Sequence, residues 1–177
     1  MAIAASDIVV RLTTKTGAAG DTNAGTPTGS LGGFTSQTAA GTGLNDLFDD
    51  VTGAENAASE AEYRAVDILN NHATLTATSV GIWLTSDVTG GAVPAIGVDP
   101  AAATAKGGTG QGASIATEDV APAGVVFSAP TTIGTMLSVG TLAPGQVRRI
   151  WIRRTAANTA ALNADGATLQ ISFDTPA

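Results

Sequence analysis

Apolar and polar residues alternate most clearly over residues 63–84, which we interpret as two strands joined by a turn. In the first strand, Val66 and Ile68 fall on one face, while Ala65 and Leu69 fall on the other. An Asn-Asn pair follows and supplies side chains that favour a turn. The rest of the chain is predicted to be organised around these two strands.

The apolar phase slips by one residue within the second of these strands. The apolar positions are odd-numbered over 73–77 and even-numbered over 80–84. A slip of one residue sends side chains to the opposite face of a sheet. We therefore predict a β-bulge or a sheet-to-sheet corner near Ser79 and Gly81.

Other segments with a strand period are spread along the chain. Ile8, Val10 and Leu12 share one face of an opening strand over 7–12, and residues 169–173 alternate in a closing strand. Pro-Gly and Asp-Gly pairs predict turns at 142–145 and 165–166. The remaining predicted strands cover residues 125–127, 135–139 and 146–154.

Segments rich in Gly, Thr and Ala separate the strands. Residues 13–43 hold few apolar positions and are predicted to be an extended arm or long loop, anchored by Leu31 and Phe34. Residues 85–122 are punctuated by Gly and Pro and are also predicted to be loop. An i, i+3, i+4, i+7 apolar pattern over 44–51 predicts a short helical turn, and the polar connector 53–62 has room for a second.

Strands, short turns and long loops in this order favour an all-β fold. We predict an antiparallel β-sandwich, Ig-like or jelly-roll-like, with at most a short helical turn. The 177 residues are enough for one domain with a real core, so residues 1–177 are predicted to form a single domain.

The charge balance argues against a nucleic-acid partner. Eight basic and 15 acidic residues give a net charge of -7, whereas binding to phosphates requires many Lys and Arg side chains. Charged residues make up only 13% of the chain, so much of the surface is small and polar. Such a surface suits packing against neighbours, although a compositional bias of the genome would produce it too.

The chain contains no cysteine, which removes thiol catalysis, disulfides and thiolate metal sites. No window approaches the roughly 18 consecutive apolar residues of a membrane span, and the N-terminus does not resemble an export signal. We therefore expect no membrane partner and no signal for secretion.

Half of the eight basic residues lie in the predicted strand over 146–154. If its isoleucines face the core, Trp151 lies outside between Arg149 and Arg153, as in a docking surface for an acidic partner. The alternative is an edge strand that is guarded by charge. The full set of candidate partner-interface residues is Leu31, Phe34, Arg148, Arg149, Trp151, Arg153 and Arg154.

Other polar groups do not form a recognisable catalytic, cofactor or metal motif. The single histidine, His72, lies in a predicted turn, and the acidic group over 46–55 lacks the spacing of a calcium loop. The Gly-rich stretch 107–112 lacks the Lys-Ser/Thr of a phosphate loop. Trp83 is interpreted as a core residue, with a sugar-stacking role as the alternative. We therefore predict no catalytic residue, no cofactor and no metal site.

Several segments together resemble structural proteins encoded in the virion gene clusters of tailed bacteriophages. They are the opening strand 7–12, Gly-Ser-Leu-Gly-Gly-Phe at 29–34, Leu-Phe-Asp at 47–49, Glu-Tyr-Arg at 62–64, Asn-Asn-His at 70–72, Leu-Ala-Pro-Gly at 142–145 and Trp-Ile-Arg-Arg at 151–154. The resemblance covers most of the chain and includes no diagnostic motif.

The resemblance implies a small β-rich virion component without enzymatic activity. It implies a capsid decoration or stabilising protein on the phage head, present in many copies, with the major capsid protein or other virion proteins as partners and with self-association. Its location would then be the virion, after assembly in the host cytoplasm. The alternatives are a neck or tail component and a carbohydrate- or receptor-binding module of the adhesin type.

Overall fold

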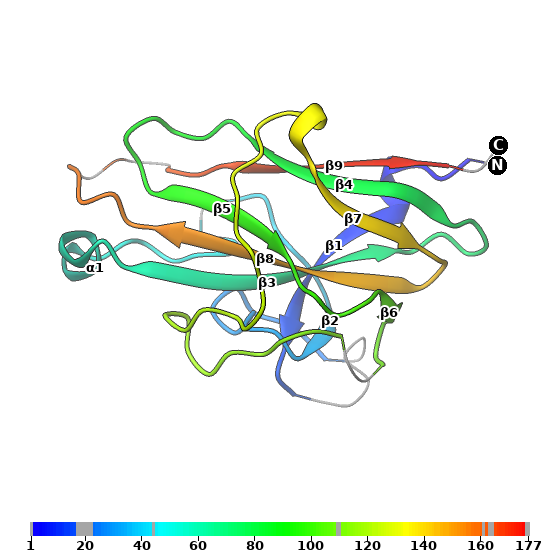
Figure 1. Cartoon of the computed structure of the whole chain (residues 1–177). Coiled ribbons are helices and arrows are strands. Elements are labelled where there is room, and N and C mark those ends of the chain that lie inside the picture. Colours follow the sequence, from blue (N-terminus) through cyan, green and yellow to red (C-terminus); the bar gives the residue numbers. More distant parts are fainter. Residues whose placement is uncertain are drawn as a thin grey trace.

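The computed structural model describes residues 2–16, 23–43, 45–108, 111–160, 162 and 165–175. Two antiparallel sheets pack face to face, with the smaller sheet above the larger one in Figure 1. The predicted all-β antiparallel sandwich is therefore confirmed. In chain order the elements are β1 (Ile8–Thr14), β2 (Phe34–Ala39), α1 (Gly53–Ala58), β3 (Ala61–Asn70), β4 (Ala77–Thr85), β5 (Val93–Val98), β6 (Thr104–Ala105), β7 (Leu137–Leu142), β8 (Gln146–Thr155) and β9 (Thr168–Asp174).

The large sheet has the strand order β2-β1-β3-β8-β5, and β6 also pairs with β8. Its centre is the long β3–β8 ladder, which runs from the pair Ala61 and Thr155 to the pair Leu69 and Val147. The small sheet has the order β7-β4-β9. β3 and β4 follow each other in sequence but belong to different sheets, so the turn after Asn70 carries the chain from one sheet to the other.

The bulge predicted from the phase slip is confirmed. The β4–β7 register shifts between Ala77 and Val80 and again between Val80 and Gly81. Ser79, between these residues, has a positive φ of 52°, a conformation that bends the strand locally. The bulge lets the apolar side chains on both sides of it face the core, since Ala77, Val80 and Ile82 are all buried.

Two predicted loops contain strands. β2 lies within the predicted arm, and the ladder between Thr13 and Thr35 shows that this part of the segment is not a free loop. β5 and β6 lie within the predicted loop 85–122 and both pair with β8. In the predicted strand 125–127 the chain is irregular, and only Ser128 next to it forms an isolated bridge with Ile96.

Of the two helical turns predicted from sequence, the one over 44–51 is not helical within the described residues, and the one in the connector 53–62 is present as α1. Residues 45–51 form turns and bends, Leu44 lies outside the described residues, and the helix is α1. Thr52 and Glu55 start it with a capping box: the Thr52 hydroxyl accepts the Glu55 N–H, and the Glu55 carboxylate accepts the Thr52 N–H. No helix within the described residues is long and apolar enough to cross a membrane.

The main core lies between the two sheets. The alternate residues of β1 and β9 that were predicted to share a face do contribute to it, and so do buried residues of β3, β4 and β8. Its fully buried side chains include Leu12, Ile68, Ile82, Leu142 and Ile150.

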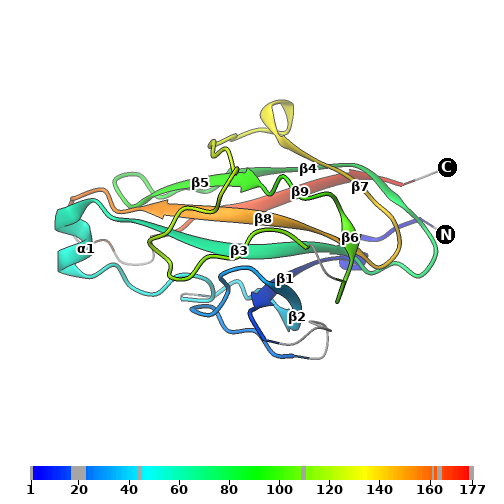
Figure 2. The ribbon, with the colours of Figure 1, turned by 60° about the horizontal axis from the view of Figure 1, so that its bottom comes forward.

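A second, smaller apolar cluster lies on the outer face of the large sheet. Ala65 of β3 and Trp151 of β8 are buried there together with Ile115 of the segment after β6. Figure 2 shows this yellow-green segment crossing β3 and β8 on the side away from the small sheet. The large sheet is therefore covered on both faces, by the small sheet on one and by loops on the other.

Candidate functional site

The strand β8, which was predicted to present the docking surface, lies in the middle of the large sheet. Arg149 is 1% exposed and Trp151 is 0% exposed. The predicted stacking of Trp151 between two surface arginines is therefore wrong. The division of faces was correct, since Ile150 and Ile152 pack on the main core, but loops cover the opposite face.

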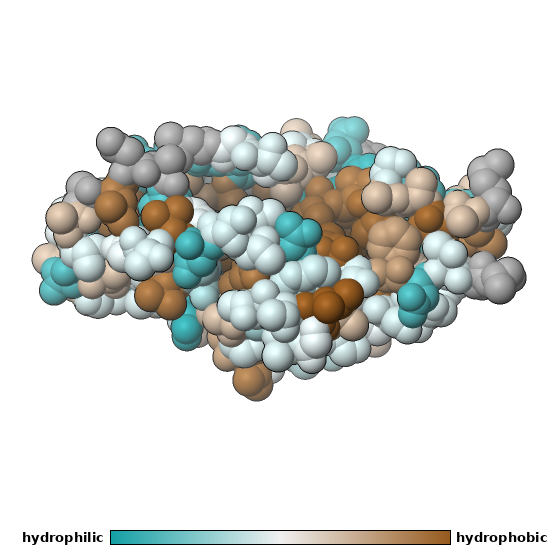
Figure 3. All heavy atoms as spheres, turned by 90° about the horizontal axis from the view of Figure 1, so that it is seen from above, coloured by the Kyte–Doolittle hydropathy of each residue, from teal (hydrophilic) through white to brown (hydrophobic). Residues whose placement is uncertain are grey.

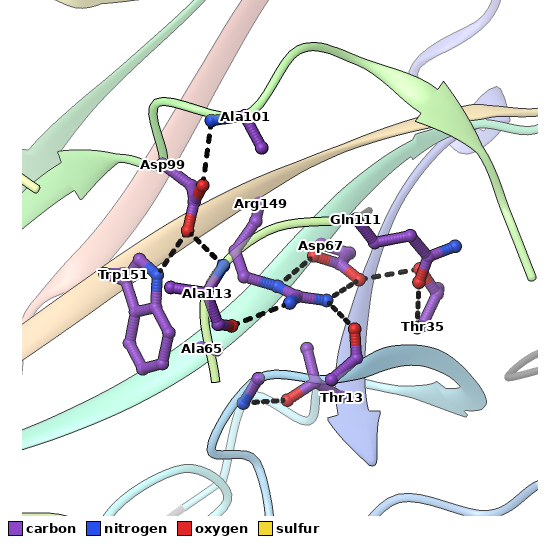
Figure 4. A network of polar contacts seen from close by, with 12 residues as sticks. Thr13, Thr35, Ala65, Asp67, Asp99, Ala101, Gln111, Ala113, Arg149 and Trp151 are labelled. Atoms are coloured by element: carbon purple, nitrogen blue, oxygen red, sulfur yellow. Dashed lines mark hydrogen bonds and ion pairs between the residues drawn. The ribbon is translucent and has the colours of Figure 1, made fainter. Parts of the chain in front are cut away.

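Arg149 forms a buried ion pair with Asp67 of β3. Its Nε donates to Asp67 Oδ1 and its Nη2 to Asp67 Oδ2, both at 3.0 Å (Figure 4). The other guanidinium bonds go to two carbonyl groups, of Gly33 at 2.9 Å and of Ala113 at 3.0 Å. Arg149 thus joins the centre of the sheet to both of the loops that cover it.

Asp99 organises the same layer from the end of β5. Its carboxylate accepts the Trp151 Nε1–H at 2.9 Å, the Ala113 N–H at 2.8 Å and the Ala101 N–H at 2.9 Å (Figure 4). Gly112 lies so close that a Cβ there would stand 2.9 Å from this carboxylate. Asp99 therefore fixes the Trp151 indole and the loop around 111–115 in one arrangement.

Hydroxyl groups attach the predicted arm to the sheet. Thr35 Oγ1 donates to Asp67 Oδ2 at 2.6 Å, and the Thr35 N–H donates to Gln111 Oε1 at 2.7 Å. Ser30 Oγ donates to the Ala65 carbonyl at 2.5 Å and accepts the Thr13 N–H at 2.8 Å. The Thr- and Ser-rich composition that suggested a free arm instead supplies the bonds that hold residues 23–43 in place.

The remaining predicted interface residues lie in different surroundings. Leu31 packs against the outer cluster, and Arg153 stacks over the Phe127 ring at 5.5 Å. Phe34 is partly buried at the start of β2. Arg148 donates to the Asp99 carbonyl at 3.0 Å. These residues therefore do not form one continuous surface with Arg149 and Trp151.

Arg154 belongs to a second ionic cluster, at the α1 end of β3 and β8. It bonds Glu62 and the Asp49 carbonyl, while Arg64 pairs with Glu118 and lies 3.7 Å from the Asp49 carboxylate. Burial raises the pKa of Glu62 above its ordinary value, and the hydrogen bond and charge of Arg154 oppose this rise.

The same cluster explains the turn over 45–51. Phe48 lies under both guanidinium groups, 5.3 Å from Arg64 and 4.8 Å from Arg154. Oxygens of Asp49, Glu62 and Glu118 approach within 4.8 Å of one another. Because two guanidinium groups already pair with these carboxylates, the geometry is that of an ion-pair network rather than of a metal centre.

A groove of about 880 Å³ opens beside this cluster. It is lined by the turn over 45–53 and by described residues of the segment before β9, within 156–160, 162 and 165–167. Its apolar floor includes Leu84, Ile152 and Leu169, which lie at the same end of both sheets. Asp165, at its margin, accepts the Ala92 N–H at 2.6 Å.

The other side chains that were considered as candidate sites from the sequence contribute to local structure. His72 Nδ1 accepts the N–H groups of Thr74 at 3.1 Å and Leu75 at 2.9 Å, which shapes the turn between the sheets. Asp46 accepts the N–H of Gly43. Trp83 is partly buried on β4, and part of the Gly-rich stretch 107–112 lies outside the described residues.

The buried ion pair was missed from sequence, although one signal for it was present. Asp67 stands inside the apolar run from Val66 to Leu69, and a charge in a buried strand requires a partner. The arginines of the strand over 146–154 were the available partners.

Comparison of the chain with protein-family models, curated proteins and solved structures found no match.

Proposed function

We propose that this chain is a non-enzymatic structural protein of a tailed-bacteriophage virion, bound in many copies to the head, where it decorates or stabilises the capsid. Its partners would be the major capsid protein or other virion proteins. The proposal rests first on the resemblance of its sequence segments to phage virion proteins.

One observation of the structure supports this proposal most strongly. The buried charged side chains are not available to a substrate. Arg149 bonds Asp67 and the Ala113 carbonyl, and Asp99 accepts the N–H of the Trp151 indole. Buried charges that are bonded in this way fix one arrangement of the loops. Rigid loops on a sandwich suit a protein whose function is to be bound in one defined pose.

The attachment of the predicted arm changes how it would act. Part of it is strand β2, and Ser30 and Thr35 bond it to β3 and to Gln111. Residues 23–43 would therefore contact a neighbouring protein as a preformed surface. A preformed surface loses less conformational entropy on binding than an arm that becomes ordered at that moment.

The alternatives from sequence are a neck or tail component and a receptor- or carbohydrate-binding module. The groove of about 880 Å³ favours the binding module, since it falls in the size range of small-ligand sites. Glycan-array binding by the isolated protein would support this alternative. Substitution of Leu162 by Asp on the groove wall should then abolish the binding.

The deciding experiment compares cryo-electron microscopy maps of particles with and without this protein. Particles from a phage that lacks the gene are imaged alone and after addition of the purified chain. Extra density over the capsomers at many equivalent positions is expected. Density only at the neck or tail would overturn the head placement, and absence of the protein from particles would overturn the virion role.

A further inference from the structure

The edge strands β2, β5, β7 and β9 differ in how their open backbone is protected. Exposed edges of sheets are normally blunted by prolines, charges, bulges or covering segments, because a free edge pairs with other strands. At the β2 edge, the Gln37 N–H donates to the Asn23 carbonyl at 2.9 Å. At the β5 edge, Ile96 and Ser128 exchange two backbone bonds of 2.8 and 3.0 Å, and Pro94 removes a donor.

β7 is irregular along its length. Its register with β4 shifts twice, and Gly140 has a positive φ of 97°. Such a strand twists away from a straight partner. β7 is therefore protected by its bulges.

β9 is less protected than these strands along its seven residues, Thr-Leu-Gln-Ile-Ser-Phe-Asp, because its one charge, Asp174, and its one register shift with β4, between Ser172 and Asp174, both lie at its C-terminal end. It contains no proline and no basic residue, and its register with β4 is continuous from Thr168 to Ser172. Within the described part of the chain, its backbone hydrogen bonds run to β4. Every second residue of an antiparallel strand directs its N–H and C=O away from the paired neighbour, so one row of β9 backbone groups faces outward.

The side chains of β9 also leave apolar surface uncovered. Leu169, Ile171 and Phe173 point into the sandwich but are only partly buried, whereas Ile82 of the adjacent β4 is 0% exposed. In Figure 3, which looks down on the small-sheet side, apolar surface is visible in the recesses between paler margins. A further strand beside β9 would cover the apolar side chains at this edge.

The sequence of β9 is self-complementary when it is read in the opposite direction. About a two-fold axis at Ile171, Leu169 faces Phe173 of the other copy and Gln170 faces Ser172. Apolar residues then meet apolar residues on the core side. The one charged residue, Asp174, faces Thr168, so two chains of net charge -7 bring no like charges together in this ladder.

We propose that two copies of this chain pair through β9, antiparallel and centred on Ile171, so that their small sheets join into one continuous sheet. The pairing is isologous, and it leaves the covered outer face of each large sheet free. It does not depend on a virion role. A dimer that is absent from phage particles would overturn the proposed function and leave this inference intact.

Paired charge substitutions at Gln170 and Ser172 test the pairing and its register. Both side chains alternate with the core-facing residues, so they lie on the outer face of the small sheet. The double variant Gln170→Lys, Ser172→Lys places Lys opposite Lys twice across the axis. The matched variant Gln170→Lys, Ser172→Glu places Lys opposite Glu twice, while spacing and side-chain length stay similar.

Sedimentation equilibrium of the full chain gives the dimer dissociation constant for each form. The dissociation constant of the Lys/Lys variant should be about tenfold or more above that of the wild type. The dissociation constant of the Lys/Glu variant should equal that of the wild type or lie below it. Equal thermal unfolding midpoints of the monomers confirm that folding is unchanged. A monomeric wild type, or equal dimer strength in both variants, would overturn the proposal.

A cysteine experiment tests the same register without charge. The chain has no native cysteine, so Gln170→Cys and Ser172→Cys variants each carry one thiol. Mild oxidation of their mixture should give disulfide-linked heterodimers in excess over either variant alone, because residues 170 and 172 face each other in the proposed ladder. Equal cross-linking in all three samples would contradict the centre at Ile171.

Discussion

Asp67 and Arg149 are direct cross-strand partners on β3 and β8, joined by two hydrogen bonds of 3.0 Å, and neither side chain is exposed. The pair lies on the outer face of the large sheet, at the point where two loops meet. Its remaining bonds, to Gly33 and Ala113, hold these loops to the sheet. A charged pair at this position therefore links the sandwich to the layer that covers it.

Removal of one partner should be far more damaging than removal of both. Arg149→Met leaves the Asp67 carboxylate buried without its cation and should lower the free energy of unfolding by about 3–5 kcal/mol. The double variant Asp67→Leu, Arg149→Met should be less destabilised, because no charge remains buried. Urea unfolding of the wild type and both variants measures the difference. A cost below about 1 kcal/mol for the single variant would contradict a structural role for the pair.

Asp99 should control the environment of the Trp151 indole. Asp99→Ala removes the carboxylate oxygen that accepts the N–H groups of Ala113 and Trp151, which should cost about 1–3 kcal/mol of unfolding free energy. The Trp151 fluorescence should shift to longer wavelength as the indole loses its partner and gains water. A Trp83→Phe background makes Trp151 the one tryptophan of the chain. An unchanged spectrum together with unchanged stability would refute this role of Asp99.

Strands with a strict period were predictable from sequence because one face of each is buried. This holds for β1 and β9, whose alternate residues pack on the core, and for the bulge of β4, which the phase slip revealed. β2 and β5 were missed for a physical reason. The sequence of β2 is mostly Thr, Ser and Gln, and that of β5 holds Pro94 and Gly97, so their strand state depends on neighbours that are distant in sequence.

The position of Trp151 shows where a strand pattern stops being informative. Alternation in the strand 146–154 correctly separated two faces, but it does not tell whether a loop covers the second face. The covering loops come from residues 23–33 and 111–128, which are weakly apolar. Their attachment depends on single polar groups, such as Thr35 and Gln111, whose partners only the fold brings together.

Gly33 should tolerate no side chain, in contrast to Gly53. A Cβ on Gly33 would stand 2.6 Å from the Thr14 carbonyl oxygen, and its φ of +88° is strained for any other residue. Gly33→Ala should therefore lower the free energy of unfolding by about 1–3 kcal/mol. Gly53, at the start of α1, has nothing within 4 Å of its Cβ position, so Gly53→Ala should be neutral or slightly stabilising. Thermal unfolding of both variants checks the contrast, which equal midpoints would contradict.

Glu62 should make the protein less stable as the pH rises. Burial raises its pKa above the ordinary value of 4.5, against the effect of Arg154, so the folded state holds this proton more tightly than the unfolded chain does. The stabilisation by the proton is then complete below the unfolded pKa and is lost as the pH rises through the folded pKa.

The Glu62→Gln variant isolates this contribution, because other groups also titrate. The wild-type unfolding free energy minus that of Glu62→Gln should fall as the pH rises above about 4.5, by at most about 1.4 kcal/mol per pH unit. Urea unfolding at a series of pH values measures it. Arg154→Met should move the fall to higher pH, since the bond that lowers the Glu62 pKa is gone. If the wild-type unfolding free energy minus that of Glu62→Gln instead rises with pH, the Arg154 charge outweighs burial in setting the Glu62 pKa.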